Sequence, residues 1–196
     1  MRKCNTLLEF SRLILNYVGN GYQEIQVSTV PEKKRQKITM IDAKITKKYQ
    51  TDLTRGQRQY RKKKGICNYV ALRYNYTILV LKTPGEIPKE IKKEEFGHIL
   101  KTKIQFEFLG IEIVHDKEGY SFKLTKKYEK EVMNRFELAI SKREQNFFKK
   151  EITKIYNLHR LLPYRVLNKQ VSNILKKIKT LQKKHNTHYK VPEFFK

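Results

Sequence analysis

The chain has 196 residues, and its 44 Lys and Arg against 19 Asp and Glu leave a formal net charge of +25 at pH 7. A compact body with this charge strongly repels itself, and nucleic acid is the leading partner because each neutralised phosphate releases condensed counterions. A nucleotide bias of the source genome would enrich Lys and Asn together, but it would neither reduce the acids so far nor favour Arg. The charge excess therefore indicates a function.

Composition excludes several other classes of protein. At 39% hydrophobic, with 10 Phe and 12 Tyr, the chain has enough apolar mass for a real core and is not a disordered basic tail. No apolar run approaches the length of a membrane span, and Glu9, Arg12 and Asn16 interrupt the opening segment, which is neither a signal peptide nor a membrane helix. Cys4 and Cys67 provide neither a disulfide framework nor metal-ligand spacing. We expect a reducing, cytoplasmic setting.

The first 50 residues predict two helices and a strand. The opening segment is amphipathic and should form a helix that stops at Gly19 or Gly21, where positive φ is easily adopted. Residues 22–30 alternate as a half-buried strand does. After a basic connector, residues 38–50 carry apolar side chains at intervals of three and four, which predicts the second helix.

Residues 51–65 form the most basic segment and should be a helix that Gly65 ends. Two runs rich in β-formers follow, at 67–74 and 76–82, and they should form a hairpin joined near Asn75. Further strands are expected within 104–124, on either side of the turn Asp-Lys-Glu-Gly.

The pattern becomes helical from Thr125, which can cap a helix, and further helices are predicted at about 144–158 and 168–184. We therefore expect an α+β fold. Residues 1–124 should form a nucleic-acid-binding body with an N-terminal helix, a mostly antiparallel sheet and a basic helix, and residues 125–196 should form about three helices packed on it.

The basic segment is the strongest candidate for a binding site. Its cationic residues are Arg55, Arg58, Arg61, Lys62, Lys63 and Lys64. Arg side chains three residues apart on a helix can meet successive phosphates, and a guanidinium matches a phosphate better than a point charge does. A solvated helix face is the alternative, but no acid lies between Asp52 and Glu86 to balance the charge, and this favours binding.

Aromatic residues are interleaved with this charge. Tyr60 lies inside the basic helix, and Tyr69, Tyr74 and Tyr76 lie on or beside the hairpin. Exposed rings would stack on unpaired bases, whereas the alternative is that they pack in the core or cover its edge. Arg73 is the more plausible contact among the hairpin residues.

The last predicted helix offers a second, weaker set of contacts. Lys169, Lys176 and Lys183 recur every seven residues on a face away from its apolar side. Surface helices commonly carry lysine opposite their apolar face. These lysines could therefore bind nucleic acid or could simply be solvated, and both alternatives stay open.

Catalysis has little support in the sequence, and we expect no enzyme activity, metal or cofactor. Asp42-Ala43-Lys44 matches the short D/E-x-K element of restriction-type nucleases, which also needs an earlier acid so that two carboxylates hold Mg²⁺. Glu24 is the obvious second acid, but an acid at the start of a helix, as Asp42 is here, is favoured by the helix dipole alone.

Three stretches resemble a family of small basic proteins encoded on bacterial plasmids and integrative elements. They are residues 41–65, residues 69–86 and residues 161–179, and the resemblance spans most of the chain. It implies a mobile-element context, in which such proteins act on DNA or on RNA and protein machinery, and it implies no particular activity or fold.

The leading hypothesis is a nucleic-acid-binding protein of a mobile genetic element that grips the phosphate backbone through the basic helix and the adjacent hairpin. Three alternatives stay open. They are an RNA-binding subunit of a ribonucleoprotein, a metal-dependent nuclease centred on Asp42 and Lys44, and an adaptor whose helical C-terminal part recruits an acidic protein partner.

Overall fold

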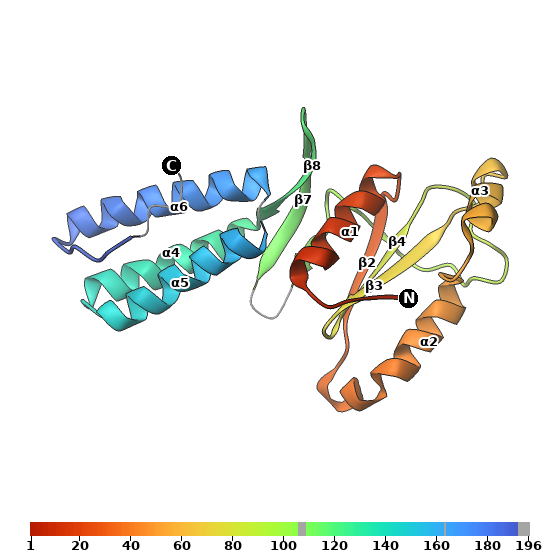
Figure 1. The fold of residues 1–196 in the computed structure, drawn as a ribbon, viewed down its shortest axis with the longest axis horizontal. Coiled ribbons are helices and arrows are strands. Elements are labelled where there is room, and N and C mark those ends of the chain that lie inside the picture. The colour runs from red at the N-terminus through yellow and green to blue at the C-terminus, as the bar shows by residue number, and fades with distance from the viewer. Residues whose placement is uncertain (106–108, 163, 192–196) are drawn as a thin grey trace. The chain divides into compact units, whose positions relative to one another are not determined.

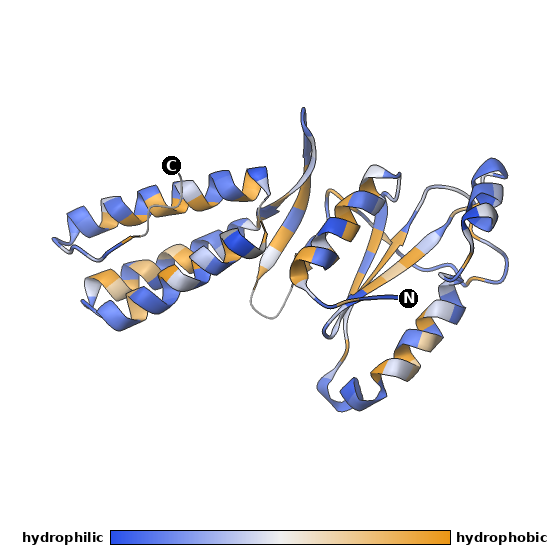
Figure 2. Cartoon of the chain, in the orientation of Figure 1, coloured by the Kyte–Doolittle hydropathy of each residue, from blue (hydrophilic) through white to orange (hydrophobic). Residues whose placement is uncertain are grey.

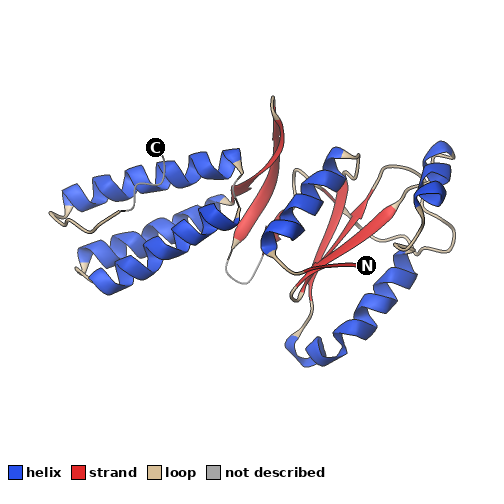
Figure 3. Ribbon diagram, in the orientation of Figure 1, coloured by secondary structure: helices blue, strands red, loops and turns tan. Residues whose placement is uncertain are grey.

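The fold is described from a computed structural model, which describes residues 1–105, 109–162 and 164–191, and among these not the side chains at 105, 159 and 161. The predicted α+β class with a helical C-terminal part is confirmed (Figure 3). The chain forms two compact units, Met1–Thr102 and Lys103–Lys196 (Figure 1).

The first unit is built on a five-stranded sheet of order β1-β3-β4-β2-β5. Its strands are β1 (Arg2–Cys4), β2 (Glu24–Thr29), β3 (Tyr69–Tyr74), β4 (Thr77–Lys82) and β5 (Gly97–His98). Strand β1 is parallel to β3, and the other pairs are antiparallel. The predicted hairpin is therefore β3–β4, with Asn75 in its turn at a φ of 50°, and it forms the centre of the sheet.

Sequence patterns did not predict β1 or β5. Strand β1 has three residues and β5 has two, which is too short for an alternating pattern to be recognised. Helix α1 (Leu7–Gly19) consequently begins later than expected, after Thr6, whose Oγ1 accepts a hydrogen bond of 3.0 Å from the backbone N–H of Glu9. It ends at Gly19, as predicted.

Helices cover both faces of this sheet. Phe10, Ile14 and Val18 form the buried stripe of α1, which packs against β3. On the other face lies α2 (Ile38–Tyr49), whose Ile41 and Ile45 pack on a buried cluster that includes strand residues of β3 and β4. Because both faces are covered, these two central strands are buried almost continuously instead of alternating.

Two short helices flank α2. The basic connector forms the 3-10 helix η1 (Glu32–Lys37), and the predicted basic helix is α3 (Arg55–Lys63). Thr54 and Gln57 form a capping box at the start of α3, and Gly65 follows its end at a φ of 70°. None of the residues of α3 is fully buried, and Figure 2 shows it as hydrophilic beside the apolar strands.

The second unit combines a three-stranded antiparallel sheet with three helices. The strands are β6 (Lys103–Gln105), β7 (Gly110–Asp116) and β8 (Gly119–Leu124), and the helices are α4 (Lys126–Ser141), α5 (Gln145–Leu161) and α6 (Arg165–Lys184). Helix α6 packs against β8 and α4, and α4 packs against α5. Thr125 caps α4 as predicted.

The division between the units falls near residue 102, whereas the sequence predicts it after residue 124. The β6–β8 sheet groups with the helices because β8 is bound to α6. The backbone N–H of Leu124 donates to Oε1 of Gln170 at 2.7 Å, and the rings of Phe122 and Tyr164 lie 5.2 Å apart. Within the described ranges, no helix is both long enough and apolar enough to cross a bilayer.

Candidate nucleic-acid interface

Helix α3 is held to the first unit at its C-terminal end by a close backbone approach. The N–H of Glu86 donates to the carbonyl of Gly65 at 2.8 Å, and the N–H of Cys67 donates to the carbonyl of Glu86 at 2.9 Å. A Cβ at Gly85 would lie 2.5 Å from the Gly65 oxygen, and Gly85 has a φ of 133°. Only glycine fits there, so the loop after β4 fixes where α3 ends.

Asn68 joins α3 to the sheet at a second point. Its Nδ2 donates to the backbone carbonyl of Arg58 at 3.0 Å, and its own N–H donates to Oγ1 of Thr83 at 2.8 Å. The side chain is buried, and its Oδ1 has no hydrogen-bond partner among the described residues. Asn68 thus sets the distance between α3 and the adjoining ends of β3 and β4.

A groove of about 450 Å³ lies along one side of α3, and we call it the basic groove. It is lined by Asn20, Tyr22, Leu53, Arg55, Arg58, Gln59, Lys62, Asn68 and Thr83. Three of these residues are cationic and none is acidic. Asn20, Tyr22, Asn68 and Thr83 carry no sequence signal of this role, because the fold brings them to α3 from the ends of α1, β3 and β4.

The structure divides the predicted cations, because only Arg55, Arg58 and Lys62 line the basic groove. Successive residues of a helix are about 100° apart, so each step of three turns back by about 60°. Arg61 therefore points to the other side of α3, where its Nη2 donates to Oε1 of Gln50. Lys62, seven residues after Arg55, returns to the basic groove.

Arg58 is the most constrained cation of the groove. Its Nη2 donates to the backbone carbonyl of Thr51 at 2.9 Å, and Tyr22 lines the same groove. Burial raises the pKa of Tyr22, and the charge of Arg58 opposes that rise. The buried Nε of Arg58 has no partner in the described part of the chain. Arg55 and Lys62 are exposed.

A second groove, of about 640 Å³, lies on the opposite side of α3, and we call it the aromatic groove. It is lined by Leu53, Gly56, Gln57, Tyr60, Arg61, Ile66, Pro88, Lys89 and Glu90. The Tyr60 ring is 60% exposed. The buried Nη1 of Arg61 has no hydrogen-bond partner among the residues described. This groove combines an accessible ring and apolar walls with a guanidinium.

The other three tyrosines that were considered for stacking pack within the protein. Tyr69 is buried, and its ring lies 5.3 Å from that of Tyr49. The ring of Tyr74 lies 5.9 Å from that of Phe10. Tyr76 packs against the core below α2, with the guanidinium of Arg35 4.1 Å from its ring centroid. Of the four, Tyr60 alone is exposed. The hairpin thus presents none of these rings as a stacking surface.

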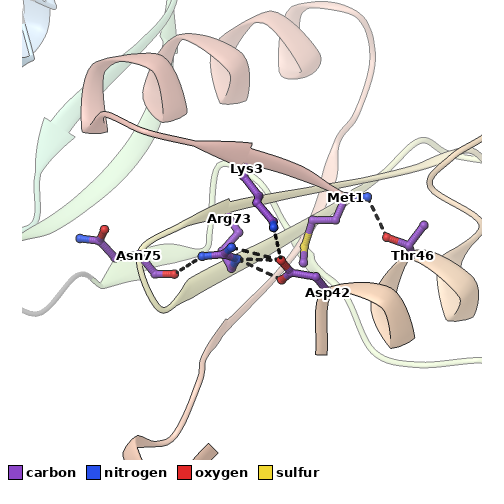
Figure 4. A network of polar contacts seen from close by, with 6 residues as sticks. All are labelled: Met1, Lys3, Asp42, Thr46, Arg73 and Asn75. Atoms are coloured by element: carbon purple, nitrogen blue, oxygen red, sulfur yellow. Dashed lines mark hydrogen bonds and ion pairs between the residues drawn. The ribbon is translucent and has the colours of Figure 1, made fainter. Parts of the chain in front are cut away.

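Arg73 belongs to a separate polar network (Figure 4). Its Nε lies 3.0 Å from Oδ1 of Asp42, its Nη2 lies 3.1 Å from Oδ2, and its Nη1 donates to the carbonyl of Asn75 at 2.8 Å. The two paired side chains are only 13% and 10% exposed. Arg73 also lies at the far end of β3 from Asn68, about 17 Å along the strand. The structure therefore separates Arg73 from the α3 grooves.

The same network explains Asp42 without catalysis. Asp42 is buried on a helix, and Nζ of Lys3 lies 3.8 Å from its Oδ2 in addition to the contacts from Arg73. Glu24, the second acid of the nuclease hypothesis, pairs with Lys82 at 2.7 Å. Among the described residues, no three His, Cys, Asp or Glu side chains gather as metal ligands.

The lysines of α6 form a separate positive face on the second unit. Lys169, Lys176 and Lys183 are exposed, and in the described ranges no carboxylate lies within 4.0 Å of any of them. Lys177 of the same helix does have such a partner, because its Nζ lies 3.0 Å from Oε1 of Glu129.

Comparison of the chain with protein-family models, with curated proteins and with solved structures gave no match. The resemblance to mobile-element proteins stays a prediction.

Proposed function

We propose that the chain binds nucleic acid through the basic groove of α3, which holds the phosphate backbone. The observation that carries this proposal is the lining of the groove, in which Arg55, Arg58 and Lys62 converge with no carboxylate among the lining residues. Guanidinium groups bind phosphate oxygens in a bidentate fashion, and Asn, Gln and Thr side chains add neutral hydrogen bonds.

Arg55 and Lys62 of the groove differ from Arg73 and Lys82, which have acidic partners. Arg73 is neutralised by Asp42, and Lys82 by Glu24. By contrast, no carboxylate lies within 4.0 Å of Arg55 or Lys62 among the residues that the structure describes. Their charge is available to an external anion, and the overall charge of +25 makes a polyanion the expected ligand.

Sequence recognition is expected to be modest. The groove offers cations and small polar groups that suit phosphate and sugar, and such contacts set position and affinity instead of reading bases. The mobile-element context is part of the proposal, since the resemblance of residues 41–65 and 69–86 implies it. A ribonucleoprotein subunit would use the same groove with RNA as its ligand.

The test compares two double variants of α3. Arg55→Gln with Lys62→Gln removes two charges from the groove, whereas Lys63→Gln with Lys64→Gln removes two exposed charges that line neither groove. Long-range attraction falls equally in both, so the difference between them measures contacts in the groove. We expect about tenfold per lost phosphate contact, hence about 100-fold for the first pair and only a few-fold for the second.

Fluorescence anisotropy with labelled single-stranded and double-stranded DNA and RNA gives these affinities between 50 and 200 mM salt. If six to ten phosphates are engaged, wild-type affinity should fall by about three to five powers of ten over this range. Equal losses in the two variants would mean that only net charge matters. If neither variant lost affinity, the basic groove would not be the binding site. A loss of affinity in the triple variant of Lys169, Lys176 and Lys183 would then place binding on α6. A flat salt profile would contradict the electrostatic premise.

A further inference from the structure

We propose that the nucleic acid bound at α3 is single-stranded, that it crosses the helix at Gly56, and that one unpaired base stacks on Tyr60. This inference rests on the proposed function, because the phosphates of the same strand would lie in the basic groove.

The two grooves lie on opposite sides of one short helix. The basic groove uses Arg55, Arg58 and Lys62, and the aromatic groove uses Gly56 and Tyr60. Leu53 lines both grooves, so a strand that occupies both would cross near the N-terminal end of α3, where Gly56 lies. The chemistry of the two sides differs as the backbone and the bases of a nucleic acid differ.

Gly56 has no structural reason to be glycine. It is the second residue of α3, and a Cβ built on it meets no atom within 4 Å. Its φ is not in the left-handed region, in contrast to Gly65 and Gly85, whose φ values are 70° and 133°. Alanine is generally a better helix former than glycine, so helix formation alone does not favour glycine at this position. Without a Cβ, the backbone at Gly56 is open to close approach by an external group.

The aromatic groove suits a base better than a phosphate. Leu53, Ile66 and Pro88 give it apolar walls, and Tyr60 presents an exposed ring on which a base can stack. In a duplex, both faces of each base are covered by its neighbours, so a base is free to stack on protein only in an unpaired strand.

The experiment compares Tyr60→Leu with its matched control Tyr60→Phe, which keeps the ring, on single strands and on duplexes of the same sequence and length. Loss of a base stack weakens binding by about 5-fold to 150-fold. We expect such a loss for Tyr60→Leu on the single strand, in DNA, RNA or both, with less than about twofold change on the duplex and for Tyr60→Phe on either ligand. A strand whose nucleotides are all abasic should bind the wild type more weakly than the normal strand, and the same change should have little effect on Tyr60→Leu.

Gly56→Ala is an independent test, because the substitution is expected to stabilise α3 and to weaken ligand binding. The substitution should raise the urea concentration at the unfolding midpoint, and it should weaken single-strand binding. Unchanged binding by Gly56→Ala would overturn the crossing point.

The outcomes separate this inference from the proposed function. If Tyr60→Leu binds both single strands as the wild type does while the Arg55 and Lys62 double variant loses affinity, the groove holds phosphates and the base site is wrong. Equal losses of Tyr60→Leu on single strand and duplex would also overturn the base site. If the double variant loses nothing, the proposed function itself fails.

Discussion

Replacing Asp42 with Asn isolates the charge of one buried carboxylate. The side chain keeps its shape, but the guanidinium of Arg73 loses the anion that now faces it at 3.0 Å. Arg73 keeps its hydrogen bond to the carbonyl of Asn75, which is neutral. The variant therefore leaves an uncompensated cation between α2 and β3.

The expected loss of stability in Asp42→Asn follows from the burial of the ion pair. Removing one partner of a buried ion pair costs about 3–5 kcal/mol, and we take about 3 kcal/mol because the two side chains retain 13% and 10% exposure. Lys3 adds little, since its side chain is 57% exposed and its Nζ is 3.8 Å away, so Lys3→Gln should cost only tenths of a kcal/mol. For a unit of this size, about 3 kcal/mol corresponds to a fall in Tm of roughly 12–24 °C.

The assay exploits the position of the cysteines. Cys4 and Cys67 are the only two in the sequence, both are buried, and both lie in the first unit. Pulsed labelling with a thiol reagent across a urea titration therefore reports the unfolding of that unit alone. Lys44→Gln is the matched control because Lys44 is exposed on the same helix, two residues away, and should change the free energy of unfolding by less than about 0.5 kcal/mol.

An Asp42→Asn variant that unfolds at the wild-type urea concentration would refute the structural role of the pair. If the variant also stays folded and Mg²⁺-dependent cleavage of nucleic acid is lost in both Asp42→Asn and Lys44→Ala, the nuclease hypothesis would replace ours. A large loss of stability in Asp42→Asn, with Lys44→Gln unchanged, would support the reasoning.

Two further predictions concern the same unit. Gly85→Ala should lower the free energy of unfolding and weaken nucleic-acid binding, because the new Cβ would lie 2.5 Å from a backbone oxygen and α3 would have to shift. The control in urea titrations and anisotropy is Gly19→Ala, where a Cβ meets nothing within 4 Å. Equal behaviour of the two variants would contradict the tight contact at Gly85. Burial, reinforced by Glu9, raises the pKa of the Cys4 thiol from 9.0 to about 11. The thiol of the unfolded chain loses its proton at lower pH than the folded thiol, so the free energy of unfolding should fall as pH rises from 9.0 towards 11. Cys4→Ser should lack this part of the fall. Identical alkaline profiles of stability for the wild type and Cys4→Ser would show that the thiol stays accessible in the folded protein.

Local patterns in the sequence determined most of the elements. Apolar spacing of three and four residues predicted α1, α2, α4, α5 and α6, and alternation with a turn at Asn75 predicted the β3–β4 hairpin. Thr125 and Gly65 were recognised as helix ends because caps act within a single turn. The excess of Lys and Arg, and its concentration in residues 55–64, can also be seen without any structure.

Tertiary structure decided which of those residues act together. Asp42 and Arg73 are 31 positions apart and meet only because α2 lies on the face of the sheet to which Arg73 points. The basic groove exists because Gly85 and Asn68 bring other segments to one side of α3. The sequence predicts both Arg61 and Lys62 as contacts, whereas the rotation of α3 against the sheet places Lys62 in the basic groove and Arg61 in the aromatic groove. The periodicity of a sequence describes each helix or strand separately. Which faces of two such elements contact each other is decided by their packing in the folded protein.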